Sequence, residues 1–263
     1  MRENNLRKLW AAGDAAVLGW LGIPSSVSAE NMAQAGWDAL NIDMQHGLID
    51  YQTAVEMLQA ISTTDAMPMC RVPWNEPGII GKMLDAGVYG VICPMVNNRE
   101  QAEALARACR YPPDGERSFG PVRATWYGGP DYFANANDSI VVLAMIETRE
   151  AVANVDEIMS TPGIDGAYIG PSDLGLSHGF VPKLDREEPE LLELIGQILA
   201  SAKRHGKVAG IHCGTPDYGR RMIADGFNLV TIGADNALLN NAAKAAVAAV
   251  KAEGGSAGGG SVY

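Results

Sequence analysis

The sequence predicts a single (β/α)8 barrel of the TIM type, an α/β fold. Eight short apolar runs alternate with longer segments of helical period, and the runs are nearly continuous, as expected for parallel strands buried on both faces. No break in composition divides the 263 residues, and such a barrel commonly uses about 250 residues in one domain. We expect the barrel over residues 1–253 and a flexible Gly/Ser-rich tail over 254–263.

The apolar runs mark the expected strands, and amphipathic segments between them mark the helices. The predicted strands are residues 15–22, 37–44, 67–73, 90–96, 140–147, 164–170, 207–213 and 227–234. Proline at a helix start and glycine at its end delimit two helices, from Pro77 to Gly87 and from Pro189 to Gly206. A doubly wound open sheet is the alternative fold, although no G-x-G-x-x-G follows the first strand, which weakens its dinucleotide-binding version.

Residues 111–139 form a long segment rich in Pro, Gly and aromatic residues after the fourth β/α unit. A loop of this length in a compact domain is usually functional, so we expect a lid or an interface element.

Composition narrows the class of protein. The net charge of -11 argues against a nucleic-acid partner, and it means that an anionic substrate would need local positive charge. No apolar segment approaches the roughly 20 residues that span a bilayer, and no basic-then-apolar leader is present. The four cysteines form no C-x-x-C pair and are interpreted as small buried residues. We therefore expect a cytoplasmic protein without a membrane partner.

Polar residues collect where the predicted strands end. In a parallel barrel, catalytic groups project from the carboxyl ends of the strands. The polar side chains expected at this rim are Asp43 and His46 after the second strand, Arg71 on the third, Glu147 at the end of the fifth, Ser172 and Asp173 after the sixth, and His212 on the seventh. Their convergence on one rim predicts an active site.

Each of these residues also has an ordinary structural explanation. Arg71 is as well suited to a simple salt bridge as to binding an anion. Glu147 and Asp173 carry oxygens of the type that Mg²⁺ or Mn²⁺ prefers, but they could equally start a helix and cap one. For His212, inside an apolar run, a hydrogen-bonded core histidine is favoured over a ligand.

Missing motifs exclude several chemistries. No lysine lies at the carboxyl end of a predicted strand, which disfavours Schiff-base catalysis. The sequence has no G-x-S-x-G nucleophile elbow and no phosphate-binding loop of the G-x-x-x-x-G-K-[ST] type.

Six ordered motifs resemble one known family. They are D-x-x-H at 43–46, CRVP at 70–73, LDAG at 84–87, RYPPDGERSFG at 110–120, IETREA at 146–151 and GPSDL at 170–174. Together they are similar to the HpcH/HpaI family of metal-dependent pyruvate aldolases, which includes 4-hydroxy-2-oxoheptanedioate and 2-dehydro-3-deoxyglucarate aldolases. The resemblance runs from about residue 5 to residue 250.

The resemblance implies a role for each motif residue. Glu147 and Asp173 would be the metal ligands, and Arg71 would balance the negative charge of an enolate oxygen. His46 would be the general base, acting through a water molecule, and Asp85 would raise the basicity of that histidine. Pro171, Ser172 and Asp173 would bind the substrate together with Arg71.

The chain also departs from the family pattern. Relatives often have D-G-E-H where this chain has Asp43-Met44-Gln45-His46, so the second carboxylate of that turn is missing. Asp43 itself is expected to position the turn or to hold water near the metal, and not to act as the base. Met145 replaces a glutamine found in many relatives, which removes a polar contact to substrate or water. Arg123, in a divergent loop, is a candidate substrate contact.

The implied function is a divalent-metal-dependent aldolase that cleaves or forms 4-hydroxy-2-oxo acids, from pyruvate or a related 2-keto acid plus an aldehyde, through a metal-bound enolate. The metal would be Mg²⁺, Mn²⁺ or Co²⁺, with no organic cofactor. The resemblance also implies a hexamer, a trimer of dimers, with C-terminal helices packed on a neighbouring subunit, and a place in aromatic-compound catabolism. The alternatives are a related lyase or decarboxylase acting on oxaloacetate or a citramalyl-type substrate, or a non-catalytic barrel.

Overall fold

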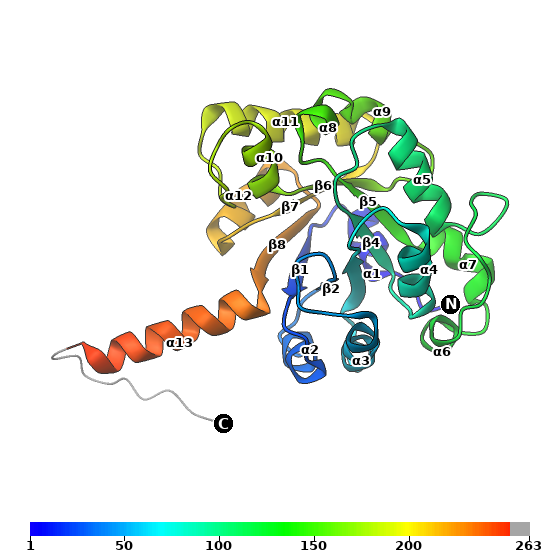
Figure 1. Ribbon diagram of the computed structural model, residues 1–263, viewed down its shortest axis with the longest axis horizontal. Helices are drawn as coiled ribbons and strands as arrows, with labels where there is room; N and C mark the ends of the chain where they lie inside the picture. The colour runs from blue at the N-terminus through cyan, green and yellow to red at the C-terminus, as the bar shows by residue number, and fades with distance from the viewer. Residues whose placement is uncertain (253–263) are drawn as a thin grey trace.

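The computed structural model of the protein describes residues 1–252, which form a closed barrel of eight parallel strands (Figure 1). The strands pair in chain order, and β8 pairs with β1. They are β1 (Ala16–Leu21), β2 (Ala39–Asp43), β3 (Met67–Arg71), β4 (Gly90–Cys93), β5 (Val141–Met145), β6 (Gly166–Ile169), β7 (Val208–His212) and β8 (Leu229–Ala234). Each lies inside a predicted run, so the predicted (β/α)8 barrel is confirmed. The predicted tail, 254–263, lies outside the described residues.

Helices surround the strands. They are α1 (Asn5–Ala12), α2 (Ser26–Ala33), α3 (Tyr51–Ile61), α4 (Pro77–Asp85), α5 (Arg99–Cys109), α6 (Arg123–Gly128), α7 (Tyr132–Ser139), α8 (Arg149–Ala153), α9 (Val155–Met159), α10 (Pro171–Ser177), α11 (Pro189–Arg204), α12 (Pro216–Asp225) and α13 (Asp235–Lys251). As predicted, α4 and α11 begin at proline, where the missing N–H would have no helical partner. Among the described residues, no helix is long and apolar enough to cross a membrane.

Two apolar layers hold the barrel together. Alternate residues of a strand point to opposite faces, so Leu40 and Ile42 pack outward against the helices while Ala39 packs inside the barrel. The same alternation turns Asp43 inward at the carboxyl end of β2. The four cysteines are all buried with free thiols, as predicted.

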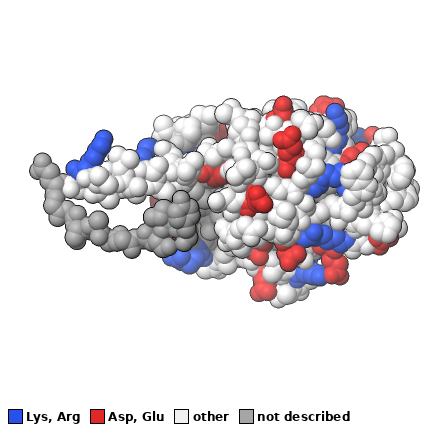
Figure 2. All heavy atoms as spheres, turned by 90° about the horizontal axis from the view of Figure 1, so that it is seen from below, with Lys and Arg blue, Asp and Glu red and all other residues white. Residues whose placement is uncertain are grey.

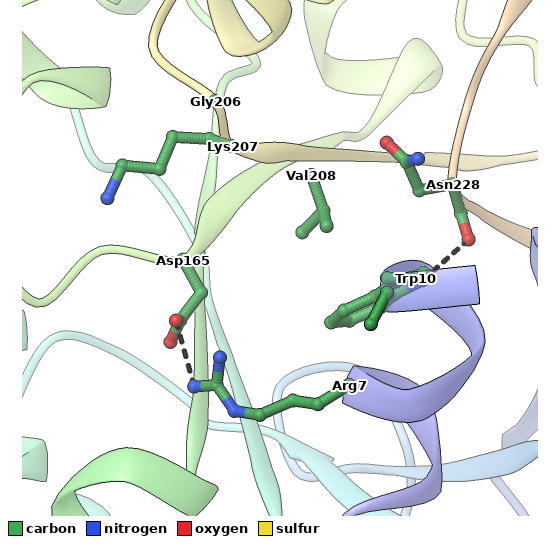
Figure 3. Close-up of a pocket in the computed structure, with 8 residues that line it drawn as sticks. Arg7, Trp10, Asp165, Gly206, Lys207, Val208 and Asn228 are labelled. Carbon is green, nitrogen blue, oxygen red and sulfur yellow. Dashed lines mark hydrogen bonds and ion pairs between the residues drawn. The ribbon is translucent and has the colours of Figure 1, made fainter. Parts of the chain in front are cut away.

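Helix α1 closes the amino end of the barrel. Asn4 donates from Nδ2 to the carbonyl oxygens of Tyr89 and Ser139. Figure 3 shows a cavity of about 410 Å³ beside α1, where the Arg7 guanidinium lies 2.9 Å from Asp165 Oδ1. Lys207, on the opposite wall, donates to the carbonyl oxygen of Ile164. Both cations that line this cavity therefore serve the fold.

The segment 111–139 also lies at the amino end, because it joins α5 to the start of β5. It contains α6 and α7 rather than an open loop. Arg123 donates to the carbonyl oxygens of Leu58 and Ala86 at the ends of α3 and α4, and burial lowers its pKa. Within one chain the segment is therefore no lid over the catalytic rim, and Arg123 is a structural residue rather than a contact to this chain's own substrate. Whether the segment forms an interface stays a prediction.

Helix α13 projects away from the barrel as a mostly uncharged rod (Figures 1 and 2). Its large apolar side chains Leu238, Leu239, Val247 and Val250 are exposed. Within residues 1–252, α13 is held at its start, where buried Asp235 accepts from the backbone N–H groups of Gly22 and Ile23. In place of covering its own barrel, the final helix leaves an apolar surface open.

Candidate active site

The register of β2 and β3 places Asp43 directly beside Arg71. Arg71 donates from Nε and Nη2 to the two carboxylate oxygens, at 2.8 and 2.6 Å, and the two side chains are only 12% and 6% exposed. Burial alone would raise the pKa of Asp43, but the hydrogen bonds and charge of Arg71, with a bond from Trp20, hold it below its ordinary value. Arg71 is thus fixed by an ionised partner in a two-bond geometry.

Asp43 also builds the turn that carries His46. Its Oδ1 accepts from the backbone N–H groups of Gln45 and His46, at 3.1 and 3.2 Å, an arrangement typical of an Asx turn. A Cβ on Gly47 would lie 2.2 Å from the Asp43 carbonyl oxygen, so the close approach of the chain requires glycine. The turn leaves His46 exposed at the carboxyl end of the barrel.

Trp20, at the end of β1, was missed by the sequence reasoning. Its Nε1 donates to Asp43 Oδ2 at 3.1 Å, and the Arg71 guanidinium lies 4.8 Å from its ring centroid, in cation–π contact. The rule that selected the other residues looked for polar side chains at strand ends, and Trp20 stands in an apolar run, so it was counted with the core.

Glu147 is a buried carboxylate directly after β5, only 2% exposed. Its Oε1 accepts from the backbone N–H of Met95 at 2.9 Å, and Met95 adopts a φ of 55°, which strains a non-glycine residue. Burial raises the pKa of Glu147 to about 7, and the negative charge of Asp173 contributes to this rise. The hydrogen bond from the Met95 N–H and the positive charge of Arg71 act in the opposite direction and lower it. Gly170 leaves the room for Glu147, since a Cβ there would lie 2.3 Å from Oε2.

The ordinary structural explanations do not account for this acidic pair. Helix α8 begins at Arg149 with Thr148 as its cap, and the cap position of α10 is held by Gly170, not by Asp173. In residues 1–252 neither carboxylate has a salt bridge to Lys or Arg. No group of three or more His, Cys, Asp or Glu side chains in that range could hold a metal. Two carboxylates completed by water and substrate oxygens are a typical magnesium-type donor set, so the residues fit a hard divalent cation.

A cavity of about 430 Å³ opens at the same rim. It is lined by Trp20, Gly22, Ile23, Pro24, Asp43, His46, Gly47, Leu48, His212, Ala234 and Asn236. His212, for which a core position was favoured, instead forms part of the cavity wall. Its Nδ1 lies 3.3 Å from the hydroxyl of Tyr168, which lies 2.6 Å from Thr231 Oγ1.

Four further predicted residues lie in different parts of the fold. Asp85 ends α4, on the outer layer and toward the amino end, where it pairs with Arg117 at 2.7 Å. Within one chain it therefore does not contact His46, and the expected Asp85–His46 pair is not formed. Met145 is buried inside the barrel next to Gly170. Pro171 is buried and Ser172 partly buried in the first turn of α10, beside Asp173.

Comparison with known proteins identifies the family. The sequence pattern of the HpcH/HpaI aldolase/citrate lyase family matches residues 17–242. The chain is 46% identical over 249 residues to a hydroxypyruvate/pyruvate aldolase of Rhizorhabdus wittichii, covering 95% of this chain and 99% of that protein. It is 38% identical over 249 residues to a 4-hydroxy-2-oxo-heptane-1,7-dioate aldolase of Escherichia coli, covering 94% of each.

A solved structure agrees with this assignment. An HpcH/HpaI aldolase/citrate lyase family protein from Burkholderia cenocepacia superposes with a TM-score of 0.88 at 32% identity, covering 95% of this chain and all of that one. The chain therefore belongs to the HpcH/HpaI aldolase/citrate lyase family, and the prediction of a carbon–carbon lyase is confirmed at the level of that family.

Proposed function

We propose that the protein is a divalent-metal-dependent aldolase that cleaves or forms 4-hydroxy-2-oxo acids, joining pyruvate or a related keto acid such as hydroxypyruvate to an aldehyde. The names of the two relatives support this class of substrate. The observation that carries the proposal is the buried Glu147 carboxylate, which lies near the negative charge of Asp173 and is bonded to no cationic side chain of residues 1–252.

Glu147 and Asp173 would hold the metal. Two neighbouring carboxylates, one of them buried, repel each other unless a cation lies between them. When bound, a divalent cation would polarise the keto oxygen of the substrate and so favour negative charge there. Ser172, in the first turn of α10, would bind the keto-acid carboxylate.

Arg71 would stabilise the same oxygen from the other side. Asp43 occupies its Nε and Nη2, whereas Nη1 makes no hydrogen bond to any of residues 1–252. A guanidinium held this rigidly can present its free N–H groups to a developing oxyanion with little reorganisation.

His46 would move the proton. In the cleavage direction it would accept the proton of the C4 hydroxyl, directly or through water. The C3–C4 bond then breaks, its electron pair passes toward the keto oxygen, and the aldehyde leaves. Imidazole suits this step because its ordinary pKa lies near neutral pH.

Metal dependence is the decisive test. The protein is stripped with a chelator and assayed for pyruvate release from a panel of 4-hydroxy-2-keto acids, with Mg²⁺, Mn²⁺ or Co²⁺ restored one at a time. Glu147→Gln and Asp173→Asn should abolish both activity and Mn²⁺ binding, measured separately by calorimetry. Glu190→Gln, on α11, is the matched control. Full activity of the stripped protein, or unchanged Mn²⁺ binding in both variants, would rule the proposal out.

We also propose that the protein is a homo-oligomer in which α13 packs on a second copy of the chain. The support is the exposed apolar surface of α13, which includes Leu239 and Val250. Such an assembly would be a hexamer by family resemblance, and a contact between Asp85 and His46 would have to join two copies of the chain. Light scattering of the purified protein and of Leu239→Asp tests this; a monomeric wild-type protein would refute it.

A further inference from the structure

The wall of the catalytic cavity contains a histidine that the proposed mechanism does not use. His212 ends β7, and its ring packs edge-on to Trp20 with centroids 4.8 Å apart. The chain of contacts from Nδ1 through the Tyr168 hydroxyl to Thr231 fixes the orientation of the ring. Within residues 1–252, His212 itself makes no hydrogen bond to Arg71 or to the proposed metal ligands.

The other ring nitrogen, Nε2, makes no hydrogen bond to any of residues 1–252, although the ring is partly exposed and lines the cavity. If Tyr168 donates to Nδ1, Nε2 is a donor; if Nδ1 donates to Tyr168, Nε2 is an acceptor. A hydroxyl group is the ligand that satisfies both cases, because it can donate and accept.

Charge argues in the same direction. Burial, and then the nearby Arg71, lower the pKa of His212 to about 4, so the imidazole is neutral at neutral pH. None of the residues that line the cavity is a lysine or arginine, and its one carboxylate, Asp43, is already paired with Arg71. The cavity of one chain thus offers hydrogen bonds to a neutral ligand and no free positive charge to a carboxylate.

The position of the cavity assigns it to one half of the substrate. The groups proposed to hold the keto acid come from β3, β5 and β6, whereas the cavity residues come from β7, β8, β1 and β2. His46, which would take the C4 proton, lines the cavity. Substituents beyond C4, which derive from the aldehyde, therefore extend toward His212.

We propose that His212 is a specificity-determining residue that hydrogen-bonds a hydroxyl group on the aldehyde half of the substrate. The enzyme then favours uncharged hydroxyaldehydes over aldehydes that lack this hydroxyl or carry a carboxylate. The inference rests on the proposed aldolase function.

The test compares matched aldehydes in condensation with pyruvate, using enzyme loaded with Mg²⁺ or Mn²⁺. Glycolaldehyde and acetaldehyde differ by one hydroxyl, and succinic semialdehyde carries a carboxylate. One hydrogen bond corresponds to about a tenfold difference in kcat/KM. His212→Leu should lower the glycolaldehyde-to-acetaldehyde ratio about tenfold, and His212→Gln should retain part of it. Because the ratio is compared between variants, the intrinsic reactivity of the aldehydes cancels.

Tyr168→Phe provides a second route to the same answer, since it keeps the imidazole but removes the hydroxyl that fixes it. It should lower the ratio less than His212→Leu does. Oxaloacetate decarboxylation needs only the keto-acid half of the site and should stay within about twofold in all variants. Thermal melting checks that each variant is folded.

The outcomes separate the two proposals. An equal fall of kcat/KM for both aldehydes in His212→Leu, or a wild-type preference for succinic semialdehyde, overturns the role of His212 and leaves the aldolase proposal standing. A wild-type protein that decarboxylates oxaloacetate but condenses no aldehyde overturns both.

Discussion

Replacing Asp43 by Asn tests whether the Asp43–Arg71 pair is the structural centre of the rim. The substitution keeps the shape of the side chain and one oxygen for the turn, but it removes the charge and turns an N–H₂ group toward Arg71. Both side chains are nearly buried, so Arg71 would be left as a buried cation without its counterion. Breaking such a pair from one side costs about 3–5 kcal/mol.

The magnitude can be compared with an exposed pair in the same chain. Arg99 and Glu103 form an i,i+4 ion pair with side chains 49% and 40% exposed. Glu103→Gln should therefore cost no more than about 0.5 kcal/mol. Urea unfolding of the wild-type protein and both variants at pH 7, followed by circular dichroism, measures the difference.

The pH dependence gives a second readout. The pKa of Asp43 in the folded protein lies below its ordinary value of 3.8. The Asp43–Arg71 pair therefore stabilises the fold fully at a pH above 3.8, the ordinary pKa of the carboxyl group. Its contribution is lost as the pH falls through the lower pKa that Asp43 has in the folded protein. The free-energy gap between wild type and Asp43→Asn should narrow in acid. If Asp43→Asn is no less stable than Glu103→Gln at pH 7, the reasoning from burial is wrong.

Three other substitutions test separate parts of the site. His46→Ala should lower aldol turnover at least a hundredfold while Mn²⁺ binding stays within about twofold; equal losses of both would reject its assignment as the base. Gly170→Ala should weaken Mn²⁺ binding more than tenfold, because the new methyl group would displace the Glu147 carboxylate, and unchanged calorimetric affinity would contradict this steric argument. Arg123→Ala should lower the free energy of unfolding by about 1–3 kcal/mol, because it removes two partly buried hydrogen bonds to helix-end carbonyls. Its kcat and KM should stay unchanged; a raised KM would instead restore it as a substrate contact.

Much of the site could be predicted from the sequence, because catalytic groups of a parallel barrel lie at the carboxyl ends of its strands. Strands buried on both faces leave unbroken apolar runs, so their ends could be located and the polar residues there collected. Asp43, Arg71, Glu147 and Asp173 were found in this way, and their geometry is compatible with one shared site. Trp20 was missed because it stands in an apolar run and the rule collected only polar side chains.

Other residues could not be placed by that rule. His212 stands in an apolar strand, and that sequence context is the same for a histidine in a sealed core and for one in a cavity wall. Only the packing of Trp20 and Tyr168 around the ring decides which of the two positions it takes. The motif around Asp85 suggested a partner for His46, yet helix α4 runs back toward the amino end before Asp85 is reached. Arg123 also lies toward the amino end, because its segment joins α5 to the start of β5.

By itself, the sequence determined the eight strands, their order, the family and the set of chemically competent rim residues. These features depend on hydrophobic periodicity and on short motifs, and both are contained in the sequence of each separate segment. Only the tertiary structure decided that Arg71 is held at two nitrogens by Asp43, that His212 borders the cavity, and that Arg123 bonds to the ends of α3 and α4. The physical reason is that sheet register and barrel closure set the distances between side chains on different strands, and no single segment of the sequence contains that information.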